Sequence, residues 1–346
     1  MKNLRRLLLP LSFLYRGVLW LRNFMYNTGI LKSYNPAIKT ICIGNIALGG
    51  TGKTPHIEYI LQLIAHKNTA VLSRGYGRKS NDTIIVTSQS NTNYTGDEPL
   101  QIARKFPNTK VVVDGNRLRG IAFIKKQFPD TDIILLDDAF QHRKLKAGLN
   151  ILLTTFDQPF TSDYYLPAGN LRDHKIRAKQ ADVIVVTKCP DDLNAAEVNA
   201  VKDKLRKYSP RILFDKIAYK KALPVFESLQ KSVKDYQKVF LISGIAKPGF
   251  FRNKAEKTFN VIKHFNFRDH YQFTLSDLER FRNFIGSFAP GEICALTTEK
   301  DAMRMLHLLK NSSPDELPLF YWEIGINMGN YKTEFDNLIL NYVEQT

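Results

Sequence analysis

Long apolar runs and cysteines are scarce in this sequence of 346 residues. No uncharged apolar run reaches the roughly 18 residues that a membrane-spanning helix requires, so the sequence predicts no span. The three cysteines, Cys42, Cys189 and Cys294, are far apart and share no metal-ligand spacing. Their number and spacing argue against a disulfide framework or a zinc site, and favour small buried residues in a reducing compartment.

Acidic residues are absent from the start of the chain, where the first carboxylate is Glu58. The same stretch contains many basic residues: Lys2, Arg5, Arg6, Arg16, Arg22, Lys32 and Lys39. The whole chain carries a net charge of +17. Such an excess indicates an anionic partner, and nucleic acid, anionic lipid and a phosphorylated substrate all qualify.

The basic N-terminal segment has helical periodicity. At about 100° per residue, one broad arc collects the apolar positions: Phe13, Leu14, Gly17, Val18, Leu21, Phe24 and Met25. Arg16 and Asn23 lie opposite, and Pro10 and Arg16 interrupt the run that a secretory signal would need. This pattern predicts an amphipathic helix in the headgroup region of an anionic membrane. The alternative is a helix that packs against its own domain.

The rest of the chain alternates β-branched apolar runs with helical patterns, which predicts an α/β fold with a parallel sheet covered by helices on both faces. Strands are expected at 38–45, 69–77, 109–115, 132–139, 150–156 and 181–188, and a second set at 211–219, 238–246, 292–303 and 317–326. We therefore expect three parts: an N-terminal helix at 1–30, a P-loop kinase domain at 31–210, and a smaller α/β domain at 211–346 that closes over a cleft.

The segment "GNIALGGTGKTP", Gly44 to Pro55, follows the first of these strands and has the character of a phosphate-binding loop. Its glycines let backbone N–H groups turn toward an anion, Lys53 reaches the β- and γ-phosphates, and the Thr54 hydroxyl binds Mg²⁺. The nucleotide-binding residues are expected to be Ile46, Ala47, Leu48, Gly49, Gly50, Thr51, Gly52, Lys53 and Thr54. Ala47 replaces a glycine of the usual pattern.

Two carboxylates, Asp137 and Asp138, follow the apolar run "IILL" and fit the second magnesium anchor that a P-loop requires. A plain turn is the alternative. The guanine-reading pattern Asn-Lys-x-Asp is missing, because Thr187, Lys188, Cys189 and Pro190 stand after the late strand. Leu48 replaces the lysine that partitioning ATPases carry before the double glycine.

Together these motifs resemble the tetraacyldisaccharide 4′-kinase family. The matching blocks are "GNIALGGTGKTP", "SRGYGR", "GDEP", "LLDDAFQHR", "LPAGNLRD", "ISGIAKPGFF", "FRDHYQF" and "TTEKDAMRM", in family order from residue 44 to 305. Two departures are Asp173, where the family usually has Glu, and Tyr271, where a second His is common.

The resemblance implies an enzyme that uses Mg²⁺ and ATP to phosphorylate the 4′-hydroxyl of an acylated glucosamine disaccharide 1-phosphate. The product would be lipid IV-A, made at the cytoplasmic face of the inner membrane by a peripheral or monotopic protein. The resemblance makes Asp97 the base that takes the hydroxyl proton, paired with His270 of the second domain, while Lys53 completes the catalytic set. Substrate-binding residues are expected to be Arg74, Tyr76, Arg78, Gln141, Asn170 and Arg172.

A second hypothesis, from another class, is a P-loop binding switch that docks on nucleic acid or membrane through its basic surface. Aromatic residues interleaved with a stripe of Lys and Arg would favour nucleic acid. In the N-terminal segment the aromatics stand beside aliphatic residues, which favours lipid. We therefore expect a membrane surface, and no nucleic acid, as the partner of this segment.

Overall fold

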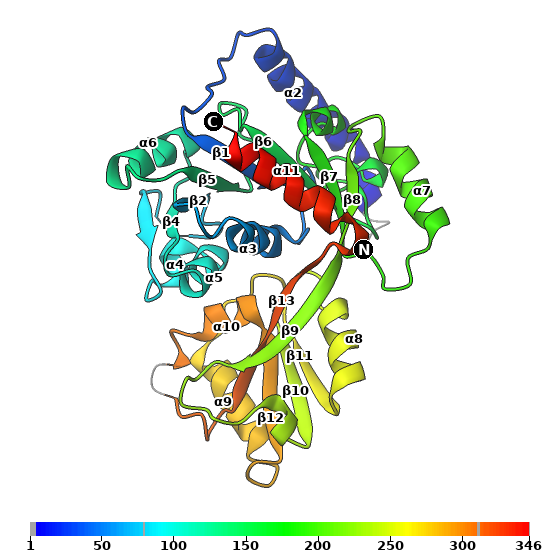
Figure 1. Cartoon of the computed structure of the whole chain (residues 1–346). Coiled ribbons are helices and arrows are strands. Elements are labelled where there is room, and N and C mark those ends of the chain that lie inside the picture. Colours follow the sequence, from blue (N-terminus) through cyan, green and yellow to red (C-terminus); the bar gives the residue numbers. More distant parts are fainter. Residues whose placement is uncertain (1–4, 79, 310–311, 346) are drawn as a thin grey trace.

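The structure is a computed structural model that describes residues 5–78, 80–309 and 312–345. Its strands form two separate sheets, one of eight strands and one of five, which lie in the upper and lower parts of Figure 1. Residues 1–4 of the expected N-terminal part lie outside the described residues.

The larger sheet is parallel except for one edge strand. Its strands are β1 (Lys39–Gly44), β2 (Thr69–Ser73), β3 (Ile84–Val86), β4 (Lys110–Val113), β5 (Ile133–Asp137), β6 (Leu149–Thr155), β7 (Val183–Thr187) and β8 (Ile212–Phe214). Their order is β3-β4-β2-β5-β1-β6-β7-β8, and only β3 runs antiparallel to its neighbour. The strand that precedes the P-loop, β1, thus lies between β5 and β6.

Helices cover both faces of this sheet. One face packs against α3 (Lys53–Leu63), α5 (Asp97–Lys105) and α11 (Lys332–Glu344), and the other against α6 (Arg117–Gln127) and α7 (Ala195–Leu205). Successive residues of β1 point to opposite faces, so Ile41 and Ile43 join the first core and Cys42 the second. A parallel sheet buried on both faces is thus confirmed. All three cysteines are buried and unpaired, as expected.

The smaller sheet contains β9 (Lys216–Pro224), β10 (Lys238–Ser243), β11 (Val261–Asn266), β12 (Ile293–Thr298) and β13 (Leu319–Asn327), in the order β11-β10-β12-β13-β9. Its helices are α8 (Gly249–Thr258), α9 (Leu275–Ile285) and α10 (Glu299–Met305). The long strands β9 and β13 are antiparallel and connect the two parts: β9 leads from the larger part into the smaller one, and β13 leads back (Figure 1).

The division between the two sheets differs from the one expected near residue 210. Strand β8 pairs with β7 in the larger sheet instead of starting the second set, because its three residues are buried beside that sheet. At the other end of the chain, Phe335 and Ile339 of α11 fill the core of the larger sheet. The chain therefore leaves the larger part after β8 and returns to it after β13.

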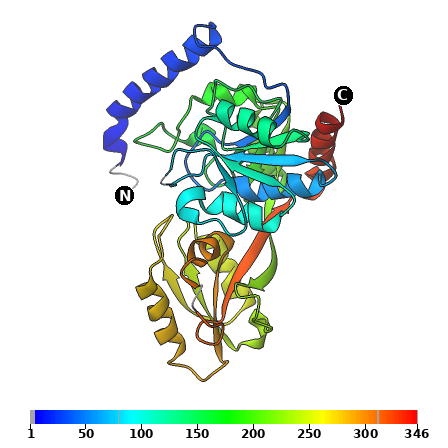
Figure 2. The same cartoon turned by 90° about the vertical axis from the view of Figure 1, so that its left-hand side faces the viewer.

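The N-terminal helix α2 (Leu9–Asn27) lies along the outside of the larger part (Figure 2). It docks through polar groups: the Ser12 hydroxyl donates to the Tyr165 carbonyl over 3.0 Å, and the Asn23 amide donates to the Asp173 carboxylate over 3.2 Å. The expected apolar arc faces outward, with Leu14 70% exposed. None of the helices in the described part of the chain is long and apolar enough to cross a membrane.

Candidate functional site

The phosphate-binding loop connects β1 to α3 and has the backbone that an anion site needs. Gly49 and Gly52 have φ angles of 118° and 91°, a region that side chains with a Cβ rarely adopt. Helix α3 begins at Lys53, so its first N–H groups and its dipole point toward the loop. Thr54, the second residue of α3, is buried.

Ala47 is accommodated because this half of the loop is extended. It forms a β-bridge with Leu171, and the Leu48 N–H donates to the Asn170 carbonyl over 2.8 Å. The Arg172 N–H donates to the Ile46 carbonyl in the same ladder. The missing glycine is therefore not needed at position 47, and the segment 170–172 acts as a wall of the loop.

The two aspartates after β5 have different surroundings. Asp138 lies 3.9 Å from the Lys53 ammonium and also pairs with Arg172, and these two cations, despite burial, hold its pKa below the usual value. Asp137 is buried and accepts a 2.7 Å hydrogen bond from the Ser73 hydroxyl. Burial, with the nearby carboxylates Glu98 and Asp138, raises the pKa of Asp137 to about 6.

The residues at the end of β5 fit a magnesium ion. The Oδ1 atom of Asp137 is buried and has no hydrogen-bond partner among the described residues. A buried carboxylate oxygen without a hydrogen-bond donor is stabilised when a cation binds to it. Mg²⁺ in nucleotide sites usually takes one or two carboxylates and completes its shell with water and phosphate oxygens. Asp137, Asp138 and the Thr54 hydroxyl offer that donor set.

Asp97 and His270 come together through a third residue, Arg304 of α10. The Arg304 guanidinium forms an ion pair with the Asp97 carboxylate, and its Nη2 lies 3.2 Å from Nδ1 of His270. Because arginine can only donate, Nδ1 accepts, so the proton of the neutral imidazole is on Nε2. Burial opposes the ionisation of Asp97, but the charges of Arg304 and Lys300 outweigh it and lower the pKa of Asp97.

A second ion pair runs beside the first. The Lys300 ammonium pairs with the Glu98 carboxylate, so two consecutive acids at the start of α5 meet two cations one turn apart on α10. Helices α5 and α10 belong to the larger and the smaller part respectively. The two parts of the molecule are thus joined by charges at the edge where the β5 carboxylates lie.

The three expected substrate-binding residues of "SRGYGR" have different surroundings. The Tyr76 ring is exposed and lies 5.1 Å from the His270 ring, measured between centroids, which places it beside Asp97 and Arg304. Arg74 is exposed on the loop after β2. Arg78 donates to the carbonyls of Asp82 and Val113, so it is occupied in holding its own loop.

Of the other expected substrate residues, Arg172 lies nearest to the carboxylates, because it pairs with Asp138. The Gln141 side chain donates to the Asn45 carbonyl, which fixes the start of the phosphate-binding loop. The Asn170 amide donates to Asp163 over 3.1 Å. Asp173, the departure from the family pattern, is fully buried and bonds to Asn23 of α2.

Sequence reasoning missed Arg304, Lys300 and Glu98 as site residues. Lys300 and Arg304 stand in the block "TTEKDAMRM" and Glu98 in "GDEP", and neither motif by itself indicates a role for them. One signal was present: Lys300 and Arg304 are four residues apart after an apolar run, which puts two cations on one face of a helix that follows a strand. Their partners, in contrast, are about 200 residues away in the sequence.

Comparisons with known proteins agree with one another. A model of the tetraacyldisaccharide-1-P 4′-kinase family matches residues 4–344. The tetraacyldisaccharide 4′-kinase of Flavobacterium psychrophilum is 40% identical over 358 residues, covering 100% of this chain and 99% of the relative. That of Bacteroides thetaiotaomicron is 35% identical and covers 99% and 94%. Among solved structures, LpxK from Aquifex aeolicus in complex with ATP has a TM-score of 0.76 and 28% identity, over 98% of this chain and 99% of that chain.

Proposed function

The chain belongs to the tetraacyldisaccharide 4′-kinase family, and from this premise we propose that the edge of the larger sheet around Lys53, Asp138 and Asp97 is its active site. The chain is an ATP-dependent kinase that phosphorylates the 4′-hydroxyl of a tetraacyldisaccharide 1-phosphate and yields lipid IV-A. The hypothesis of a P-loop binding switch that docks on nucleic acid or membrane is therefore set aside.

One observation carries the proposed site: the buried carboxylate Asp97 begins α5, and its neighbour Glu98 lies close enough to Lys53 and Asp137 to act on their charges. In the reaction, Asp97 accepts the proton of the 4′-hydroxyl, the oxygen forms a bond to the γ-phosphorus, and ADP leaves with the electrons of the broken P–O bond. Lys53 meets the charge that builds on the β- and γ-phosphate oxygens. We expect Arg74 and Tyr76 to contact the disaccharide that accepts the phosphate.

The direct test is a transfer assay. Purified protein is incubated with labelled ATP, Mg²⁺ and the acylated disaccharide 1-phosphate, and the lipid fraction is separated. We expect a lipid that carries a second phosphate. A protein that binds ATP but labels no lipid would contradict the assigned reaction.

We propose that Asp137, Asp138 and Thr54 hold a magnesium ion that neutralises charge on the bound triphosphate. The Asp138→Asn variant should then need at least about tenfold more Mg²⁺ for half-maximal rate, because one anionic ligand is lost. The KM for the lipid should change little, since Asp138 meets the acceptor only indirectly. The measurement is a magnesium titration of the rate at saturating ATP.

Asp203→Asn, on the exposed surface of α7, is the matched control for the loss of one carboxylate. It should leave the magnesium titration unchanged. If Asp138→Asn instead raises the KM for lipid and leaves the magnesium requirement as it was, the metal assignment is wrong.

We propose that α2 places the enzyme on the cytoplasmic face of the inner membrane. The helix is held to the body by Ser12, Tyr15 and Asn23, so its apolar arc stays available. Each large side chain that enters the bilayer contributes about 1.5–3 kcal/mol, and each arginine near an anionic surface about 1 kcal/mol. Arg16 is exposed on the same helix.

Replacing Phe13, Leu14, Val18 and Leu21 by serine should release the protein from anionic vesicles in a flotation assay. These side chains are exposed, so the fold and the thermal midpoint should be kept. Turnover on the long-chain lipid should fall more than turnover on a short-chain analogue, because only the former resides in the bilayer.

Serine at three exposed apolar positions elsewhere, Ile85, Ile262 and Leu275, is the control for general loss of apolar surface. This variant should float like the wild type. Deleting residues 1–25 is a poorer test, since it also removes the partner of the buried Asp173. The wild type and the four-serine variant are compared at low and high salt. If both float equally, α2 does not bind the membrane and serves only as part of the fold.

A further inference from the structure

Backbone strain marks three non-glycine positions among the described residues. Asp138, His270 and Lys188 have positive φ angles of 51°, 54° and 59°. Such conformations persist where the surrounding structure enforces them, and they gather at functional sites. Asp138 and His270 belong to the proposed active site, whereas Lys188 has had no role so far. It follows β7 directly, at the carboxyl edge of the larger sheet.

The order of the strands gives the bound triphosphate a direction. The proposed metal ligands Asp137 and Asp138 and the proposed base Asp97 lie on the β5 side of β1, so the γ-phosphate must face that side. The nucleoside end must then leave on the other side of β1, over β6 and the next strand, β7. Ligands of open parallel sheets lie beyond the carboxyl ends of the strands. Lys188 stands at that end of β7.

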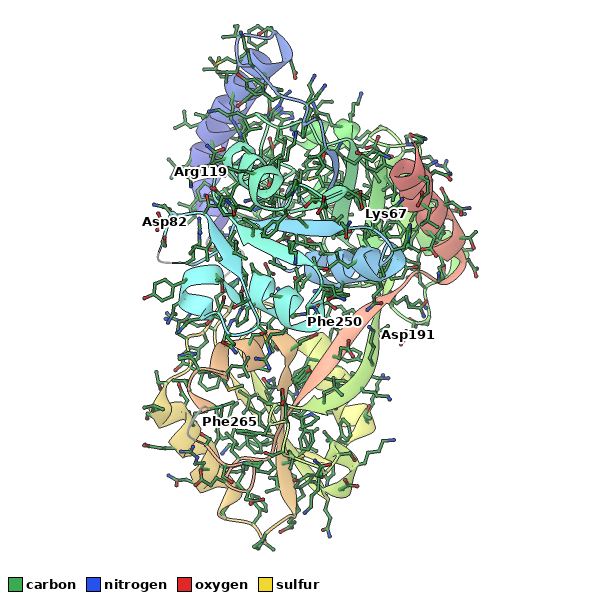
Figure 3. All side chains as sticks on the ribbon, turned by 60° about the vertical axis from the view of Figure 1, so that its left-hand side comes forward. Lys67, Asp82, Arg119, Asp191, Phe250 and Phe265 are labelled. Atoms are coloured by element: carbon green, nitrogen blue, oxygen red, sulfur yellow. The ribbon has the colours of Figure 1, made fainter. Side chains whose placement is uncertain are left out.

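Contacts bring the end of β7 against the phosphate-binding loop. The Thr187 hydroxyl donates to the Thr51 carbonyl over 2.9 Å. The Nζ atom of Lys188 would lie 3.8 Å from a Cβ placed on Gly50, so the ammonium is at the rim of the loop. It also lies 5.8 Å from the centre of the Phe250 ring, which α8 of the smaller part supplies. Figure 3 shows Phe250 at the junction of the two parts.

The Lys188 ammonium has no carboxylate within ion-pair distance in the described chain. Four charged groups lie around it: Lys247 and Lys300 of the smaller part, and Asp157 and Asp215 of the larger part. Asp157 is already paired with Lys247 over 2.6 Å, and Asp215 lies 2.8 Å from the His56 ring. Burial first, and then the two lysines, lower the pKa of Lys188 to about 8. This cation therefore lacks an anion of its own.

We propose that Lys188 binds the phosphate chain of ATP from the nucleoside side, and that Phe250 packs against the base or ribose. The inference rests on the proposed function and adds the residues that hold the far end of the nucleotide. It also gives the smaller part a role in ATP binding, since Phe250 reaches the nucleotide only when the two parts lie together as they do here.

The test is the binding of two ligands, ATP and inorganic tripolyphosphate, measured by calorimetry with Mg²⁺. Lys188→Met keeps the stem and the Cβ and removes the charge. We expect it to weaken both ligands about ten- to a hundredfold, the size of one charge-assisted hydrogen bond. Phe250→Ala should weaken ATP and leave tripolyphosphate unchanged. Lys126→Met, at the exposed end of α6, is the control for one lost charge and should bind both ligands normally.

A second readout is pH. In the wild type, ATP affinity should fall as the pH rises through about 8, because deprotonation removes the cation, and this fall should be absent in Lys188→Met. Unchanged affinity of Lys188→Met for both ligands overturns the assignment of Lys188, and unchanged ATP affinity of Phe250→Ala overturns that of Phe250. Wild-type protein that binds ATP in this way but transfers no phosphate would contradict the proposed function alone.

Discussion

The Lys53→Met variant will lose phosphoryl transfer by at least about a hundredfold, the cost of removing one preorganised charge from a transition state. Lys53 is the first residue of α3, and its ammonium points to the rim where Asp138 lies, 3.9 Å away. Methionine keeps the length of the stem and the helix propensity. Asp138 retains its pair with Arg172, so the fold should be kept.

The measurement is turnover at saturating ATP and lipid, with a thermal melt of the same preparation. Lys67→Met removes one lysine charge beyond the far end of α3, where Lys67 pairs with Glu344, and serves as the matched control. It should keep the wild-type rate. Turnover of Lys53→Met close to that of the wild type would show that this loop does not hold the reacting triphosphate.

The larger sheet could be predicted from the sequence because its signals are local. Six apolar runs became β1, β2, β4, β5, β6 and β7, and the loop after β1 has its strained residues at glycines. Three strands were not predicted correctly, each for a physical reason. Strand β3 has only three residues, and the apolar run of β11 is broken by the exposed Lys263 and the half-buried His264. Strand β8 joins the larger sheet through pairing with β7, which no local pattern encodes.

The N-terminal helix illustrates a different limit. Its apolar arc followed from the 3.6-residue period. The sequence did not reveal that the opposite side carries the docking contacts, because Ser12 and Asn23 find their partners about 150 residues later. A polar docking face is the reason why the apolar arc remains exposed on this molecule.

The candidate site was predicted where its residues share one loop or strand end, as Lys53, Asp137 and Asp138 do. The resemblance supplied Asp97 and His270, but the sequence did not show that the guanidinium of Arg304 lies between them. Arg304 lies on α10, in the same part as His270, and it reaches Asp97 of α5 only because the two parts pack together. Contacts of this kind depend on how two domains meet, and this is why Arg304 was missed.

The arrangement around Arg304 leads to the most demanding prediction, which concerns the proton of the sugar hydroxyl. Asp97→Ala and His270→Ala should each lower turnover about 10²- to 10⁴-fold, the range of general base catalysis. Both side chains are oriented by one guanidinium, so they should act as a unit. The double variant should then be little slower than the slower single variant, since residues that share one task are non-additive.

Arg304 is a positioning residue in this scheme, and pH separates its role from a merely structural one. In the wild type the pKa of Asp97 is low, so the base is ionised throughout the neutral range. In Arg304→Gln, burial remains while the main compensating charge is lost, so the pKa of Asp97 must rise. The acidic limb of the pH-rate profile should therefore move to higher pH. Arg282→Gln, whose partner Glu316 lies far from the site on the smaller part, should leave the limb in place.

The outcome that contradicts this scheme is specific. If the losses in Asp97→Ala and His270→Ala add in free energy, the two residues have separate tasks, such as metal binding and sugar binding. If Arg304→Gln also keeps the acidic limb of the wild type, Asp97 is not the group that titrates in the reaction. The chain would then be a P-loop kinase whose base lies elsewhere, and Glu98, which pairs with Lys300 one residue further along α5, would be the next carboxylate to replace.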